Sequence, residues 1–164
     1  MSKLTDQLVL VLDKEQEIYD AVIKLSKDKQ DAIVQNNIAR LEDVIKKEKT
    51  YAISLAKLEE IRERVINQLL KYYDLRDINA ISDLYVFMSD KEVREIDGIR
   101  KKLVNTVNIL SQKNEMNRRL IEQSLDQIEF DLNLITTVGD GSVNYEGTAS
   151  DQEVERRSIF DRKI

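Results

Sequence analysis

Helix-breaking residues are almost confined to the C-terminal end of this chain. Proline is absent from all 164 residues, and three of the four glycines, Gly139, Gly141 and Gly147, lie close together near the C-terminus. Because proline and glycine oppose helix most strongly, nearly everything before Gly139 is free to form helix. Charged residues make up 35% of the chain and apolar residues 41%, which favours long, exposed helices with narrow apolar seams.

The chain before the first pair of asparagines carries a regular apolar seam. From about Ser2 to Gln35 the apolar residues recur in alternating steps of four and three, with Glu15 and Lys29 as polar interruptions. This heptad pattern is typical of a helix that packs lengthwise on another helix. The sequence therefore predicts a first long helix, with its seam at Leu4, Leu8, Val11, Ile18, Val22, Leu25 and Ala32.

A tight turn is expected at Asn36-Asn37, because asparagine tolerates the left-handed conformation and also caps helix N-termini. A second long helix is predicted from Ile38 to about Asp74. So short a connection leaves only an antiparallel hairpin for the two helices. The buried face of the second helix is predicted at Leu41, Ile45, Ala52, Leu55, Leu58, Val65, Leu69 and Tyr72.

A short apolar element and a third long helix are expected after this hairpin. Residues 77–88 are richly apolar, and we predict a short helix or turn that covers the end of the hairpin. Ser89 and Glu92 have the spacing of a capping box, so a helix is predicted from there to about Ile135. Its seam is predicted at Val93, Ile96, Leu103, Val107, Leu110, Asn114, Asn117, Ile121, Leu125, Ile128, Leu132 and Ile135.

Two features of the third helix have alternative interpretations. At Asn114 and Asn117 either the helix is half exposed, which we favour, or a polar seam residue fixes its register against a neighbour. A second apolar stripe either packs on another helix of the bundle, which is the simpler interpretation, or offers a ridge to a partner helix. This stripe consists of Ile109, Met116, Leu120, Phe130 and Leu134.

The character of the chain changes after Ile135. Residues 136–164 are polar, mixed in charge and poor in apolar groups, so they bury too little surface to offset the entropy of ordering. We therefore predict an all-α fold in two parts. Residues 1–135 form a helical bundle domain, with three long helices in an elongated antiparallel bundle or coiled coil and a short connecting helix. Residues 136–164 form a disordered, flexible C-terminal tail, in which Tyr145, Ile159 and Phe160 are either partner anchors or ordinary scatter.

The composition excludes most catalytic and metal-binding chemistry. Histidine and cysteine are absent, which removes histidine-based triads, thiol chemistry and the usual zinc ligands. No phosphate-binding glycine motif is present, so we expect no enzyme, no cofactor and no metal. The formal net charge of −5 argues against nucleic acid as the main partner. We find no signal peptide and no apolar run long enough for membrane insertion, and we expect a cytoplasmic protein.

The most recognisable stretch of the chain is NEMNRRLIEQSL, from Asn114 to Leu125. It is similar to a pattern close to N-x-x-N-R-x-L-I-E-Q-S-L that leads into the end of the last long helix in the FlgN family. The continuation from Ile128 to Leu134 also fits that family, as does the order of an acidic helix, an asparagine turn and a second charged helix. The resemblance covers about residues 4–135, and the stretch from Asn114 to Leu125 is its most specific part.

This resemblance implies a cytoplasmic chaperone of the flagellar type III export system. FlgN-type proteins bind the hook–filament junction proteins, or hook-associated proteins, keep them soluble and deliver them to the export gate. Their C-terminal part carries substrate binding and meets the gate. The matching parts here are the end of the third helix and the tail, so the expected partner-binding residues are Met116, Leu120, Phe130, Leu134, Tyr145, Ile159 and Phe160.

Two alternatives fit the same pattern. A structural coiled coil or spacer explains the heptads and the charge equally well, although it leaves the second apolar stripe unexplained. An adaptor unrelated to flagellar export also fits a short, acidic, helical chain. The sequence does not decide between a monomer and a homodimer, and it does not say which junction protein is preferred.

Overall fold

The computed structural model describes residues 3–139, and the side chains of residues 3–137. Its elements are α1 (Lys3–Val34), α2 (Ile38–Tyr72), the short 3₁₀ helix η1 (Ile81–Phe87) and α3 (Asp90–Gly139). Between residues 3 and 139 there is no strand, and no helix is both long and apolar enough to cross a membrane. The predicted all-α fold, with three long helices and a short connecting helix, is confirmed.

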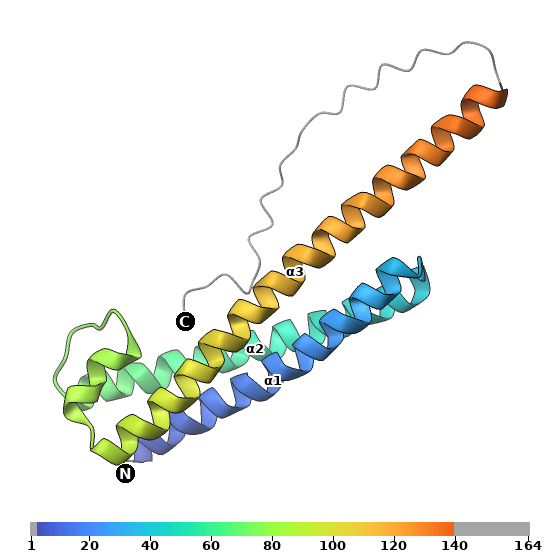
Figure 1. Ribbon diagram of the computed structural model, residues 1–164. Coiled ribbons are helices and arrows are strands. Elements are labelled where there is room, and N and C mark those ends of the chain that lie inside the picture. Colours follow the sequence, from blue (N-terminus) through green and yellow to red (C-terminus); the bar gives the residue numbers. More distant parts are fainter. Residues whose placement is uncertain (1–2, 140–164) are drawn as a thin grey trace.

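Helices α1 and α2 form the predicted antiparallel hairpin (Figure 1). Two ion pairs across it show the opposite directions of the helices. Glu15 pairs with Arg62 at 2.7 Å, and further along α1 Lys29 pairs with Glu48 at 3.2 Å. Residue numbers therefore fall along α2 as they rise along α1.

Helix α3 runs parallel to α1 and starts beside it (Figure 1). The Gln16 side chain donates to the Thr106 hydroxyl at 2.8 Å, and Asn117 donates to the Ser26 hydroxyl at 3.2 Å. Helix α1 packs against both α2 and α3. The three helices thus form an up-down-up bundle with α1 in the centre.

The hairpin turn has the conformation that its two asparagines predict. Asn36 adopts a left-handed conformation with φ of 52°, and the backbone N–H of Asn37 donates to the carbonyl of Ala32 at 2.9 Å. The Asn37 side chain then accepts a hydrogen bond from the backbone N–H of Arg40 at 3.0 Å. Asn36 ends α1 and Asn37 caps α2, so the turn and the antiparallel pairing have a local cause.

The core is thickest where η1 closes the open end of the hairpin. Leu84 of η1 is fully buried among leucines of α1, α2 and α3, including Leu12, Leu69 and Leu103. The capping box follows directly, because the Ser89 backbone N–H and hydroxyl both donate to the Glu92 carboxylate, at 2.9 Å and 2.8 Å. The predicted cover over this end and the predicted start of α3 are both confirmed.

The structure corrects two of the predicted boundaries and faces. Tyr72 is exposed at the end of α2, whereas Val44 and Leu70 are buried, because the buried face rotates slowly around a long straight helix. Helix α3 also continues through the stop predicted at residue 136 and ends at Gly139. The Thr136 hydroxyl donates back to the carbonyl of Leu132 at 3.0 Å, so threonine does not break the helix there. The division into a domain and a tail remains a prediction, since residues 140–164 lie outside the described range.

Candidate partner-binding surface

Helix α3 is longer than the hairpin on which it packs. Helix α1 has 32 residues and α3 has 50, so α3 is about 27 Å longer at 1.5 Å per residue. Both start at the same end of the molecule, and the surplus of α3 projects beyond the hairpin turn (Figure 1). We call residues 121–139 distal α3.

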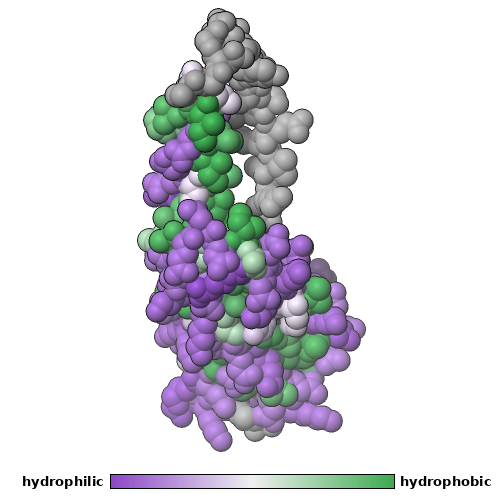
Figure 2. Space-filling model, turned by 90° about the vertical axis from the view of Figure 1, so that its right-hand side faces the viewer, coloured by the Kyte–Doolittle hydropathy of each residue, from purple (hydrophilic) through white to green (hydrophobic). Residues whose placement is uncertain are grey.

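The predicted seam continues onto distal α3, but there it faces outward. Leu125, Ile128, Leu132 and Ile135 are all exposed, Ile135 to 70%. Figure 2 shows apolar residues gathered on the projecting end of the molecule. The prediction that this part of the seam packs within the bundle is wrong, because Leu125 and Ile128 only border the hairpin turn and no other described helix covers the seam beyond it (Figure 1).

The second apolar stripe is also largely uncovered. Met116, Phe130, Leu134 and Ile109 are exposed, and Leu120 is half-buried. The favoured interpretation, that this stripe packs within the bundle, is therefore wrong. At 100° per residue, Phe130 and Leu134 lie opposite the seam, so distal α3 is apolar on two opposite sides. Tyr145, Ile159 and Phe160, the other predicted partner-binding residues, lie outside the described range.

An apolar groove lies where distal α3 passes the hairpin turn. It has a volume of about 120 Å³, and all three long helices contribute to its walls. The polar residues Asn36, Asn37 and Ser124 also line it. We call it the tip groove, and its large apolar residues are Ile33, Ile38, Leu41, Ile121, Leu125 and Ile128.

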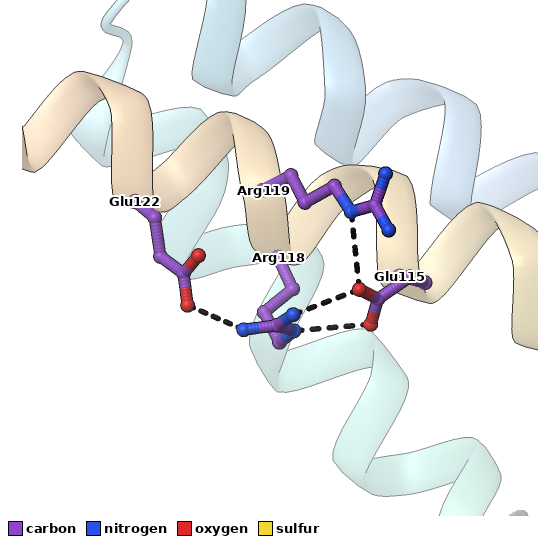
Figure 3. Close-up of polar contacts among 4 residues, drawn as sticks. All are labelled: Glu115, Arg118, Arg119 and Glu122. Carbon is purple, nitrogen blue, oxygen red and sulfur yellow. Dashed lines mark hydrogen bonds and ion pairs between the residues drawn. The ribbon is translucent and has the colours of Figure 1, made fainter.

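An ion-pair network covers the outer face of α3 just before it leaves the hairpin (Figure 3). Arg118 lies between Glu115, at 2.7 Å, and Glu122, and Arg119 contacts Glu115 at 3.2 Å. The hydrogen bond from Arg118 lowers the pKa of Glu115 to about 2, so its carboxylate stays charged well into the acidic range. These exposed pairs are spaced three and four residues apart, and such pairs stabilise a helix. They lie where α3 ceases to pack on the hairpin.

Asn117 lies on the inner face of the same stretch and is only 3% exposed. Its side-chain amide donates to the Ser26 backbone carbonyl at 3.0 Å and to the Ser26 hydroxyl at 3.2 Å. The favoured interpretation of a half-exposed helix is therefore wrong at Asn117, although it holds for the partly exposed Asn114. Asn117 instead ties α3 to α1 at one register, close to the point where α3 leaves the hairpin.

The comparisons with known proteins agree with the family resemblance that residues 114–125 carry. The family model described as FlgN protein matches residues 1–153. This chain belongs to the FlgN family. It is also similar to the uncharacterized protein YvyG of Bacillus subtilis (strain 168), with 22% identity over 148 residues, which cover 89% of this chain and 90% of the relative. No solved structure matches the chain.

Membership of the FlgN family confirms the resemblance drawn from Asn114 to Leu125. It supports a role as a flagellar export chaperone in general, and FlgN is a chaperone family rather than a known enzyme family. In this FlgN protein, the stretch of residues 114–125 has two structural roles. Its inner residue Asn117 fixes the register of α3 on α1, and its outer charged residues support the helix as it leaves the bundle.

Replacing Asn117 by alanine is expected to lower the free energy of unfolding by about 1–3 kcal/mol, because two buried hydrogen bonds to Ser26 are lost and each contributes about 0.5–1.5 kcal/mol. Asn114→Ala is the matched control, since it removes the same side chain from the same helix at a partly exposed position. Urea unfolding followed by circular dichroism measures both variants. Equal stabilities of the two variants would show that Asn117 does not tie the helices together.

Proposed function

We propose that this FlgN-family protein is a cytoplasmic chaperone that binds hook-associated (hook–filament junction) proteins on distal α3. It keeps these clients soluble and delivers them to a component of the flagellar export gate. The observation that supports the proposal is the apolar surface of distal α3. Four large aliphatic residues on one side, and Phe130 and Leu134 on the other, are exposed on a helix that extends beyond its own bundle.

The chemistry of this surface suits a reversible cover for another helix. Before export, a junction protein exposes apolar segments that later pair in the assembled filament, and an apolar helix face can mask such a segment. The stripe from Met116 to Leu134 lies opposite the seam, so a second segment of the client or the gate component can bind there. Tyr145, Ile159 and Phe160 add contacts if the tail orders on the client, which gives a large contact area at moderate affinity.

The proposal is tested by mixing the full-length protein with purified hook-associated proteins and measuring masses by size-exclusion chromatography with light scattering. We expect a complex of defined stoichiometry with at least one junction protein. A stable homodimer that binds none of them would favour the structural coiled coil or spacer instead. A complex with an unrelated export substrate alone would favour an adaptor outside flagellar export.

A further inference from the structure

The tip groove lies at the end of α1, where the support of α3 by its own bundle stops. Ile33 is the last buried apolar residue of α1, and it lines the groove together with Ile38 at the start of α2. Beyond the groove, the side of α3 that faces α1 continues as the exposed seam. A helix that entered the groove and lay along this seam would take over the place of α1.

We propose that the tip groove receives the end of one amphipathic helix of the client, which then lies along the seam of distal α3. This inference rests on the proposed function and extends it in two ways. It adds residues of the hairpin turn, above all Ile38, to a binding site otherwise formed by α3. It also specifies the kind of client segment that fits.

The dimensions of the site define the length and the side chains of that segment. The seam from Ile121 to Ile135 extends over about 21 Å at 1.5 Å per residue, which matches a client helix of about 14 residues. The groove volume of about 120 Å³ is close to the roughly 150 Å³ of a protein cavity that holds benzene. The groove therefore has room for one large apolar side chain, and the seam has room for further ones at heptad spacing.

The charge of distal α3 narrows the choice of occupant. Glu122, Asp126, Glu129 and Asp131 are acidic, and no lysine or arginine occurs between Leu120 and Gly139. A second copy of distal α3 would bring the same four carboxylates against these, and like charges in contact are strongly unfavourable. The charge therefore favours a client helix whose flanking residues are neutral or basic.

The test compares two isoleucines on the same helix. Ile38 is 67% exposed and lines the groove, whereas Ile53 is 59% exposed and lies outside it. Ile38→Ser is expected to weaken binding of a purified hook-associated protein about tenfold in calorimetric titration, as for an apolar contact at an interface. Ile53→Ser is expected to bind like the wild type, and both variants should keep the wild-type helix content.

Each other outcome of this test contradicts a specific part of the proposal. If Ile38→Ser binds as tightly as the wild type, the tip groove is not part of the site, although the complex itself still supports the proposed function. If the wild type binds no junction protein, the proposed function fails. A wild-type dimer that Ile38→Ser abolishes would assign the groove to a second copy. Higher client affinity after replacing Arg156, Arg157, Arg162 and Lys163 by glutamine would assign it to the last nine residues of the chain itself, which carry these four basic side chains.

Discussion

Arg62→Ala is expected to lower the free energy of unfolding by about 3–5 kcal/mol at pH 7, because it leaves a buried carboxylate without its counter-ion. The Glu15 side chain is 3% exposed, and Arg62 pairs with it at 2.7 Å across the α1–α2 hairpin. A buried ion pair adds little net stability when complete, since desolvation offsets much of the attraction. Removing one partner lowers the stability strongly, because the free-energy cost of desolvating the remaining charge is no longer offset.

The effect of Arg62→Ala should depend on pH in a definite direction. Burial raises the pKa of the Glu15 carboxyl above its usual value of 4.5, and the neighbouring Arg62 only partly opposes this. A raised pKa means that the folded protein binds the proton more tightly than the unfolded chain does. Protonation of Glu15 therefore stabilises the folded state as the pH falls. Without Arg62 the pKa of Glu15 rises further. The deficit of the variant should therefore be largest at pH 7 and shrink as the pH falls toward 4.5.

Urea unfolding of Arg62→Ala and of the wild type, at several pH values between 7 and 4.5, measures this difference. The control is Glu15→Gln added to Arg62→Ala, which removes the unpaired charge and should restore part of the stability at pH 7. A deficit below about 1 kcal/mol, or one that grows toward acid pH, would show that Glu15 is not held as a buried charge.

The fold was largely predictable from local sequence signals. The alternating three- and four-residue spacing located α1, Asn36-Asn37 determined the turn and the start of α2, and the capping box placed the start of α3. Each signal acts through neighbouring residues on the chain, so a single sequence contains it. The exposed Tyr72 was missed because helix ends rotate away from an ideal heptad by an amount that only the packed partner decides.

The candidate site was predicted less well, because exposure depends on where neighbouring helices end. The seam from Leu125 to Ile135 has the same spacing as the buried part of α3, and a pattern of residues does not distinguish the two. The predicted lengths did contain a usable signal. A first helix ending at Gln35 and a third helix running from Ser89 to Ile135 differ by more than ten residues, so the excess of the third helix had no partner in the bundle.

Asn117 shows a second kind of limit. A polar residue in a heptad seam indicates either exposure or a buried hydrogen bond, and the choice depends on what faces it. Here Ser26 of α1 faces it, 91 residues away in sequence, and supplies both a carbonyl and a hydroxyl. The tertiary structure was needed to identify that partner.

Replacing Ile128 and Leu132 together by glutamine is expected to weaken binding of a hook-associated protein by about 100-fold or more, because two central apolar contacts are lost at once. Both side chains are exposed on the seam of distal α3, and glutamine keeps a good helix propensity, so the fold should not change. The matched control replaces Ile53 and Ile61, two exposed isoleucines of α2, by glutamine and should bind like the wild type.

A third variant, with Phe130 and Leu134 replaced by glutamine, separates the two apolar sides of distal α3. Calorimetric titration of all three variants with the same junction protein gives the comparison. If only the Phe130 and Leu134 variant loses affinity, the client lies on the second stripe and the assignment to the seam is wrong. If both distal variants lose affinity while the α2 control does not, the client contacts both apolar sides of distal α3, and a gate component that bound there would have to compete with it. If none loses affinity, distal α3 is not the client site, and its apolar surface needs a different partner.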